Sequence, residues 1–461
     1  MKAEIPPPQR AAAFSGLIGV ARADITPPIG IYARNWGAAK HDVAEGIHRP
    51  LTLTCVTFQS SKRQKPLVLM AADLGWWKSS EDEWFIRGKV LEALSLPPSH
   101  LMFCLSHTHA GPSIFRADAS KPGGQFVGPY LRQVQRKAVQ TAQHALAKAV
   151  PATLAWRYGK CDLATNRDLL EQGKKRYVVG FNPAQKADDT LLAGRVMDKN
   201  GRSLATLVNY ACHPTTLAWD NRLISPDYIG AMREVVEAQT HAPCLFLQGA
   251  SGELAPAEQY VGNLAVADAH GRRLGYAVLG TLEGLLSAGT ALSFAGVVES
   301  GAALGIWQRS AYRVSTDLSS ERVEVALPLK PLPSLAEIEE RWRKCADRVF
   351  KERLGRQRAV RQAVGEGKSA RTHVWVWRLG DALLIGQPNE AYSQFQQKLR
   401  RQMAPNPVAV LNLVNGSIGY LPPRPFYGRD LYPVWQTPFA PGALELLTRT
   451  ASARARRMMK S

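Results

Sequence analysis

The stretch LMFCLSHTHAGP, residues 101–112, joins an apolar run to two histidines and then to a Gly-Pro pair. The run predicts a buried strand, and Gly-Pro predicts the turn that ends it. Because side chains alternate along a strand, His107 and His109 are expected to point the same way at its tip. The stretch alone leaves two readings open: a structural role for both histidines, or a metal site that uses imidazole nitrogen as a ligand.

Apolar segments of similar character lie on both sides of this stretch. We predict strands in residues 20–27, 51–59 and 65–77, an amphipathic helix in residues 81–96, and a long helix in residues 131–150. Buried strands that alternate with helices are typical of a sheet covered by helices. The expected fold class is therefore α/β, with one large catalytic domain of mixed sheets covered by helices.

Other predicted strands also end in residues that bind metals. A hairpin through Asn200-Gly201 ends at His213, and a second hairpin through Gly380-Asp381 is followed by Glu390. The next strand, residues 407–420, is expected to end at Tyr420. Ligand sites of α/β sheets tend to lie beyond strand ends. Each residue alone has an ordinary explanation: His213 as a hydrogen-bonded histidine, Glu390 as a helix-start carboxylate, Tyr420 as core. The residues by themselves indicate a metallohydrolase only as one candidate.

The predicted boundaries divide the chain into a core and two ends. We expect a flexible N-terminus in residues 1–15, the catalytic domain in residues 16–446, and a basic C-terminal tail in residues 447–461. A helical insertion packed on the core is expected at about residues 334–366. Its capping pattern is Ser334-x-x-Glu337, and its apolar stripe consists of Ile338, Trp342, Cys345 and Val349.

The chain is basic, with 58 Lys and Arg against 38 Asp and Glu over 461 residues, a net charge of +20. Much of the excess lies in residues 340–362, interpreted as a helix with a solvated face, and in residues 449–461. No nucleic-acid motif accompanies either segment, so we expect no nucleic-acid partner, although both allow contact with an anionic surface. No long apolar run or signal peptide is seen, and the six cysteines form no CxxC, which favours the cytoplasm. The sequence does not indicate an oligomeric state.

Several ordered motifs resemble the neutral/alkaline (non-lysosomal) ceramidase family over nearly the whole chain. The resemblance lies in GVARADITPP, EGIHRPLTLTCVTF, AADLGWW, SHTHAGP, ATNRDL, NYACHPTTL, LISPDYIG, QPNEAYSQFQQKLR and NGSIGYLP. Members of that family are zinc amidases that cleave the N-acyl bond of ceramide. The resemblance therefore implies an amide hydrolase that uses Zn²⁺ and acts on a small-molecule or lipid-like acylated substrate.

The same resemblance assigns roles to individual residues. It implies zinc ligands at His107, His213, Glu390 and Tyr420. His109 matches a histidine near the metal-activated water, and Arg167 matches an arginine of the polar site. The general base stays open among His109, Asp73 and Glu253. Such a metal would lower the pKa of its water and polarise the amide carbonyl, with Arg167 or His109 near the oxyanion.

The chain departs from the family pattern at one substrate-binding position. In Gly252-Glu253-Leu254-Ala255-Pro256, Ala255 stands where the family has its active-site serine, so a hydroxyl group is missing. We also expect neither the extra C-terminal domain nor the signal peptide of secreted ceramidases. Ceramide itself is therefore in doubt as the substrate. The alternatives are a metal-dependent esterase or deacylase, and a catalytically silent ceramidase-like binding protein.

Overall fold

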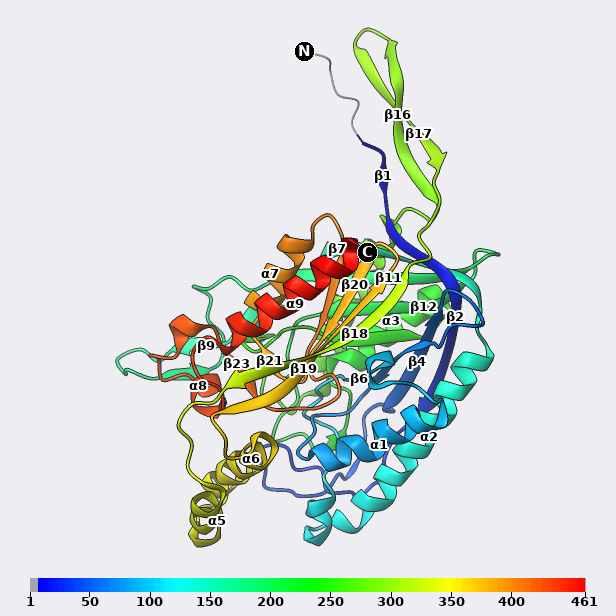
Figure 1. Ribbon diagram of the computed structural model, residues 1–461. Helices are drawn as coiled ribbons and strands as arrows, with labels where there is room; N and C mark the ends of the chain where they lie inside the picture. Colours follow the sequence, from blue (N-terminus) through cyan, green and yellow to red (C-terminus); the bar gives the residue numbers. More distant parts are fainter. Residues whose placement is uncertain (1–6, 461) are drawn as a thin grey trace.

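The computed structural model describes residues 7–460 (Figure 1). Within that range the largest sheet has eight strands, in the order β14-β12-β11-β7-β2-β4-β5-β6. Most neighbours are antiparallel, whereas β12–β14 and β5–β6 are parallel, so the sheet is mixed as expected. In that order the strands are Cys244–Gln248, Ser203–Tyr210, Thr190–Asp198, Val150–Lys160, Ala12–Asp24, Thr52–Gln59, Leu67–Ala72 and Leu101–Leu105.

A second sheet packs face to face against the first. It has the order β18-β19-β20-β22, with bounds Leu318–Pro328, Ser369–Leu379, Ala382–Gly386 and Val408–Leu411. Phe14 and Phe58 of the first sheet share one buried cluster with Trp377 and Leu411 of the second. Burial of such large apolar side chains is the main favourable contribution to folding. The interface between the sheets is therefore the centre of the core.

Helices cover the outer faces of the two sheets (Figure 1). On the first sheet lie α1 (Ser80–Ala93), α2 (Val127–Ala147), α3 (Tyr228–Thr240) and α4 (Leu264–Glu283). On the second sheet lie α7 (Gln394–Met403) and α9 (Ala443–Lys460), which share a buried cluster with it. The result is four layers, in the order helices, sheet, sheet, helices. The predicted α/β class is confirmed.

Short strand pairs connect the layers at one end of the sheets. β15 (Leu254–Pro256) pairs with β8 (Ala164–Asn166), and β21 (Glu390–Ala391) pairs with β23 (Tyr420–Leu421). The remaining short elements are β3 (Gly46–Ile47) with β13 (Leu223–Ile224), β9 (Asp168–Leu170) with β10 (Tyr177–Val179), and the helix α8 (Tyr432–Gln436). The β21–β23 pair itself carries the candidate ligands Glu390 and Tyr420.

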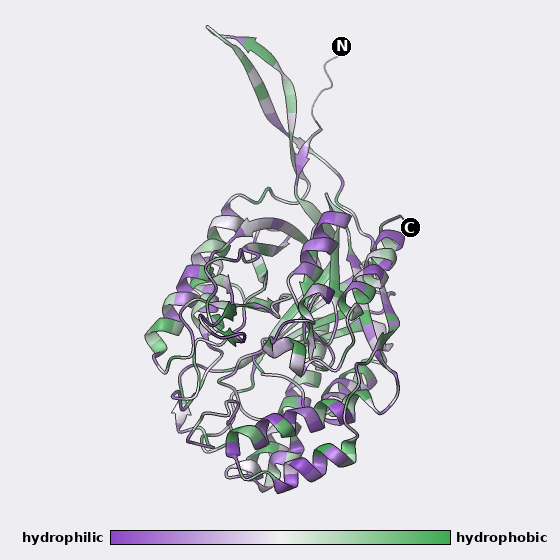
Figure 2. Cartoon of the chain, turned by 90° about the vertical axis from the view of Figure 1, so that its left-hand side faces the viewer, coloured by the Kyte–Doolittle hydropathy of each residue, from purple (hydrophilic) through white to green (hydrophobic). Residues whose placement is uncertain are grey.

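The N-terminal prediction was wrong in part. Residues 1–6 lie outside the described range, but β1 (Gln9–Arg10) and β2 form within the segment expected to be flexible, and Phe14 is fully buried. β1 pairs with β16 (Thr290–Glu299), which forms a projecting hairpin with β17 (Ala303–Ala311). This hairpin carries hydrophobic stretches along its length (Figure 2). No helix within residues 7–460 is long and apolar enough to cross a membrane.

The predicted helix at residues 334–366 consists of two helices. α5 (Leu335–Lys344) begins at the predicted capping box, and α6 (Arg348–Val364) begins after Asp347, whose side chain accepts a hydrogen bond from Phe350 N. The break moves Val349 off the expected stripe, and its side chain is 58% exposed. A continuous period of apolar residues therefore predicted one helix where the chain turns.

The predicted basic tail is also incorrect, because residues 447–460 belong to α9. Leu447, Ala451, Ala455 and Met458 are buried along one face of that helix. This spacing of one helical turn matches an amphipathic helix packed on the second sheet. The sequence prediction followed the many arginines of the segment and missed the helical spacing of its small apolar residues.

The predicted strand at residues 407–420 ends early, whereas both predicted hairpins are confirmed. β22 stops at Leu411, and Asn415, with a φ of 55°, lies in a loop tied to β6 by hydrogen bonds to Phe103 N and Leu101 O. Tyr420 begins β23 instead of ending β22. Gly380, with a φ of 60°, turns the second hairpin so close to Ala13 that any added Cβ would lie 2.1 Å from its carbonyl oxygen.

Candidate metal centre

His107 comes two residues after the end of β6 and does not lie on the strand itself. Its φ is 70°, its N–H donates to Leu74 O at 2.9 Å, and its ring Nδ1 lies 3.4 Å from Gly75 O. The strand alternation expected for the His-x-His pair therefore does not hold. The pair is still adjacent, because the ring centroids of His107 and His109 lie 4.9 Å apart.

His213 follows β12 and is completely buried. Its Nδ1 lies 2.7 Å from Ser251 O and 3.1 Å from Leu254 O. Carbonyl oxygens only accept hydrogen bonds, so Nδ1 carries the proton and Nε2 keeps a free lone pair. Burial, followed by the positive charge of Arg167, lowers the pKa of His213 to about 3. The ring is therefore neutral at pH 7, which is the form that binds metals.

Glu390 lies opposite Tyr420 in the parallel β21–β23 pair and reaches both histidines. Its Oε2 lies 3.3 Å from His107 Nε2 and 3.1 Å from His213 Nε2. Burial opposes the charged form, but His107 holds the pKa of Glu390 well below its usual range. One ligand atom from each of the three residues lies within 4.8 Å of the others. The three side chains thus converge on a single point.

These donor atoms fit a divalent cation. Because the single ring proton of His213 is on Nδ1, its Nε2 presents a lone pair to the carboxylate oxygen of Glu390. Nε2 therefore has no proton to donate to that oxygen. Two buried acceptors in contact are unfavourable unless a positive charge lies between them. Imidazole nitrogen and carboxylate oxygen are common zinc ligands. The backbone carbonyls behind the rings set their orientation, as the outer contacts of metal sites do.

Tyr420 and Arg167 lie beside this group and contact each other. Arg167 donates from Nη2 to the Tyr420 hydroxyl at 3.1 Å and to Gly252 O at 2.8 Å, while its Nε has no partner among the described residues. Burial and the charge of Glu390 raise the pKa of Tyr420 above its usual range. The structure therefore brings together all four side chains expected as ligands, and Arg167 holds the tyrosine in place.

His109 is positioned by two tryptophans that the sequence analysis did not single out. Its ring centroid lies 4.9 Å from that of Trp36 and 4.8 Å from that of Trp76. Neither ring nitrogen has a hydrogen-bond partner within residues 7–460, and burial and His107 lower the pKa of His109 well below its usual range. A neutral, unpaired imidazole at a cavity wall is able to accept a proton. Trp76 belonged to the noted AADLGWW motif, whereas no signal marked Trp36.

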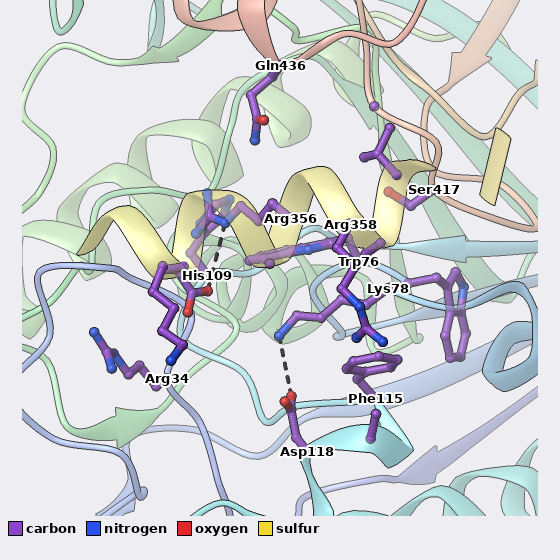
Figure 3. A pocket seen from close by; sticks show the side chains of 18 of the residues that line it. Arg34, Trp76, Lys78, His109, Phe115, Asp118, Arg356, Arg358, Ser417 and Gln436 are labelled. Atoms are coloured by element: carbon purple, nitrogen blue, oxygen red, sulfur yellow. Dashed lines mark hydrogen bonds and ion pairs between the residues drawn. The ribbon is translucent and has the colours of Figure 1, made fainter. Parts of the chain in front are cut away.

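A cavity of about 590 Å³ reaches the candidate metal centre, and Figure 3 shows part of its lining. His107, His109, Glu390 and Tyr420 line its floor, and Trp76, Trp77, Phe115 and Trp342 give it aromatic walls. Helix α6 crosses the cavity and contributes Arg356, which donates to Asn35 O at 3.1 Å and to the Tyr432 hydroxyl at 3.2 Å. The interpretation of residues 340–362 as a solvated face was therefore wrong for this side of α6.

The other candidate residues lie outside the cavity lining. Asp73 is buried, pairs with Arg233 at 2.8 Å, and accepts hydrogen bonds from Thr52. The carboxylate of Glu253 accepts from the backbone N–H and the hydroxyl of Ser393 at the start of α7. Ala255 is fully buried in the β15–β8 pair, where its carbonyl accepts from Thr165. Of the three candidates for the general base, only His109 faces the cavity.

The buried Glu253 predicts a specific pH dependence of stability. Burial raises the pKa of Glu253 to about 8, from an ordinary value of 4.5. Between these values the folded chain keeps a proton that the unfolded chain releases, so this residue makes stability fall as the pH rises. In Glu253→Gln that fall should become shallower by roughly 1 kcal/mol per pH unit, and urea unfolding of both proteins from pH 5 to pH 8 measures it. Parallel curves for the two proteins would contradict the raised pKa.

Comparison with known proteins adds a sequence match and a fold match. No family model matches the chain. Neutral ceramidase of Pseudomonas aeruginosa (strain PAO1) is 24% identical over 229 residues, which cover 48% of this chain and 34% of that protein. The matched segment thus spans about a third of that curated relative.

Two solved structures have the same fold as this chain. A ceramidase complexed with C2 superposes with a TM-score of 0.69 at 16% identity and covers 98% of this chain and 76% of its own. Neutral ceramidase from Pseudomonas aeruginosa gives 0.69 at 17% identity, with 97% and 75% covered. The chain therefore has the ceramidase fold over nearly its whole length, and about half of its sequence is similar to that of a neutral ceramidase.

Proposed function

We propose that this protein is a zinc-dependent hydrolase that cleaves the N-acyl amide bond of a small or lipid-like substrate, ceramide-like or otherwise N-acylated. His107, His213 and Glu390 would hold the metal, with Tyr420 as the fourth ligand. The proposal is supported by the shared fold with ceramidases and by the cavity above the four residues.

One observation carries the proposal: two buried imidazole nitrogens approach the same carboxylate oxygen at 3.1 and 3.3 Å. A purely structural trio would place a proton donor between these atoms, whereas His213 has its donor engaged by backbone carbonyls. This donor set favours zinc, although manganese or iron also accepts it.

The chemistry would be divided between the metal and the chain. A bound divalent cation supplies positive charge that polarises a carbonyl oxygen and lowers the pKa of a water molecule. His109 would accept and return the proton at its unpaired ring nitrogens, because its lowered pKa keeps it neutral. Arg167 would act as a positioning residue through the Tyr420 hydroxyl. The aromatic walls would bind the acyl chain.

The test combines metal content with a matched set of substrates. Elemental mass spectrometry should find about one zinc per chain, because one group of ligands binds one ion. The substrates are N-dodecanoylsphingosine, N-dodecanoylglycine and their oxygen-ester counterparts, and the released dodecanoate is measured. At least one of the two amides should be cleaved. This cleavage should stop after the metal is removed by chelation and return when zinc is added. A protein that takes up no metal when zinc is offered would overturn the proposal. Release from esters alone would replace the amidase by an esterase.

A further inference from the structure

The cavity over the candidate metal centre is lined by more positively charged side chains than its carboxylates can neutralise. Among the described residues that line it, seven are lysine or arginine and four are carboxylates. Glu390 belongs to the metal centre, Asp118 faces Lys78 at 3.4 Å, and Asp42 is shared between Arg348 and Arg34 at 2.8 and 3.7 Å. The carboxylates are thus engaged, and positive charge remains in the cavity.

Arg356 is a cation of this lining whose own partners are mostly neutral. Its two terminal nitrogens donate to a backbone carbonyl and a tyrosine hydroxyl, and the carboxylate of Glu352 lies 3.9 Å from its Nε. Arg358 on the same helix also lines the cavity, but it pairs at 2.8 Å with Glu339, which does not belong to the lining. A partly desolvated guanidinium with weak ion pairing favours an anionic partner.

Arg356 also lies next to the metal centre. The ring of Tyr432, which accepts its hydrogen bond, packs edge-on against Tyr420 with centroids 5.6 Å apart. Figure 3 shows α6 lying across the cavity, with Arg356 and His109 in the same view. An anion held by Arg356 would therefore be attached close to the bond under attack, on the amine side if the acyl chain follows the aromatic walls.

We infer that the substrate carries an anionic group, a carboxylate or a phosphate, near its amide bond, and that Arg356 binds this group. The inference rests on the proposed function and names the substrate class that the site would prefer. Ceramide has only hydroxyl groups at that end, which leave the guanidinium without a charged partner. An N-acylated amino acid or an acylated amine with a phosphate matches the cavity better.

Binding of non-hydrolysable ligands tests this inference separately from hydrolysis. The first ligand is the ketone isostere of N-dodecanoylglycine, in which a methylene group replaces the amide NH. The second ligand is the carboxamide of that ketone, which has the same shape without the charge. Isothermal titration calorimetry of the zinc-loaded full chain should show the acid binding at least about tenfold more tightly than the amide.

Variants on one helix assign this preference to its residue. Arg356→Gln should bind the acid and the amide equally, and Arg356→Lys should keep part of the preference. The matched control is Arg353→Gln, because Arg353 lies on the same helix but stacks on Trp435 outside the cavity lining. It removes the same charge and should leave the preference unchanged.

The results separate the inference from the proposed function. Equal binding of both ligands to the unaltered chain would overturn the inference, and so would a preference that survives in Arg356→Gln. Loss of both ligands together in that variant would indicate a structural role for Arg356 and would also overturn it. Because a ketone replaces the scissile N-acyl bond in both ligands, an inactive protein that still selects the acid through Arg356 would refute only the hydrolase.

Discussion

His107→Asn should lose its metal and reduce kcat/KM for the amide substrate by about 10³-fold or more, while the chain stays folded. The substitution removes one of three ligand atoms that converge within 4.8 Å. Asparagine suits this position because the φ of 70° is one that it tolerates better than alanine does. Zinc content by elemental mass spectrometry, initial rates and circular dichroism measure the three expectations.

The matched control for this experiment is His144→Ala, which removes an exposed histidine of α2. It should keep both metal and activity. Glu390→Gln provides a second variant at the centre, since it keeps the shape of the side chain and removes its charge. Full zinc content and full turnover in His107→Asn would refute this metal centre, whatever the fold resemblance.

Asp73→Asn should destabilise the folded chain by about 3–5 kcal/mol and leave the rate constant of the folded enzyme nearly unchanged. Asp73 and Arg233 form a buried pair at 2.8 Å, and their side chains are 3% and 9% exposed. Removing the carboxylate charge leaves the Arg233 guanidinium buried without compensation, which is the costly way to break such a pair. Urea unfolding measures the stability, and rates below the unfolding transition measure the activity.

An exposed ion pair provides the control for this prediction. Asp162→Asn breaks a pair with Arg273 whose carboxylate side chain is 79% exposed, and it should cost at most about 1 kcal/mol. A large loss of turnover in Asp73→Asn with unchanged stability would restore Asp73 as a general base. That outcome would contradict its observed place outside the cavity lining.

The sequence alone predicted the elements that depend on local patterns. The apolar run at residues 101–105 forms β6, and the hairpins form where Asn200-Gly201 and Gly380-Asp381 supply the required turns. Residues 447–460 were misassigned because charge dominates their composition, and residues 334–366 because a continuous apolar period does not reveal the break between α5 and α6. Which face of a helix is buried depends on what packs against it. Ala455 of α9, for example, is buried because this face of the helix packs on the second sheet.

The sequence by itself determined the residue types of the candidate site: the histidines of the SHTHAGP stretch, a histidine after a second strand, and Glu390 and Tyr420 near the C-terminus. Only the tertiary structure decided which of them meet. The φ of His107, the backbone carbonyls behind His213 and the β21–β23 pair bring the donor atoms together. The tertiary structure also placed Asp73 in an ion pair and Arg356 in the cavity. These are contacts between segments far apart in the chain, and local sequence patterns do not encode such distances.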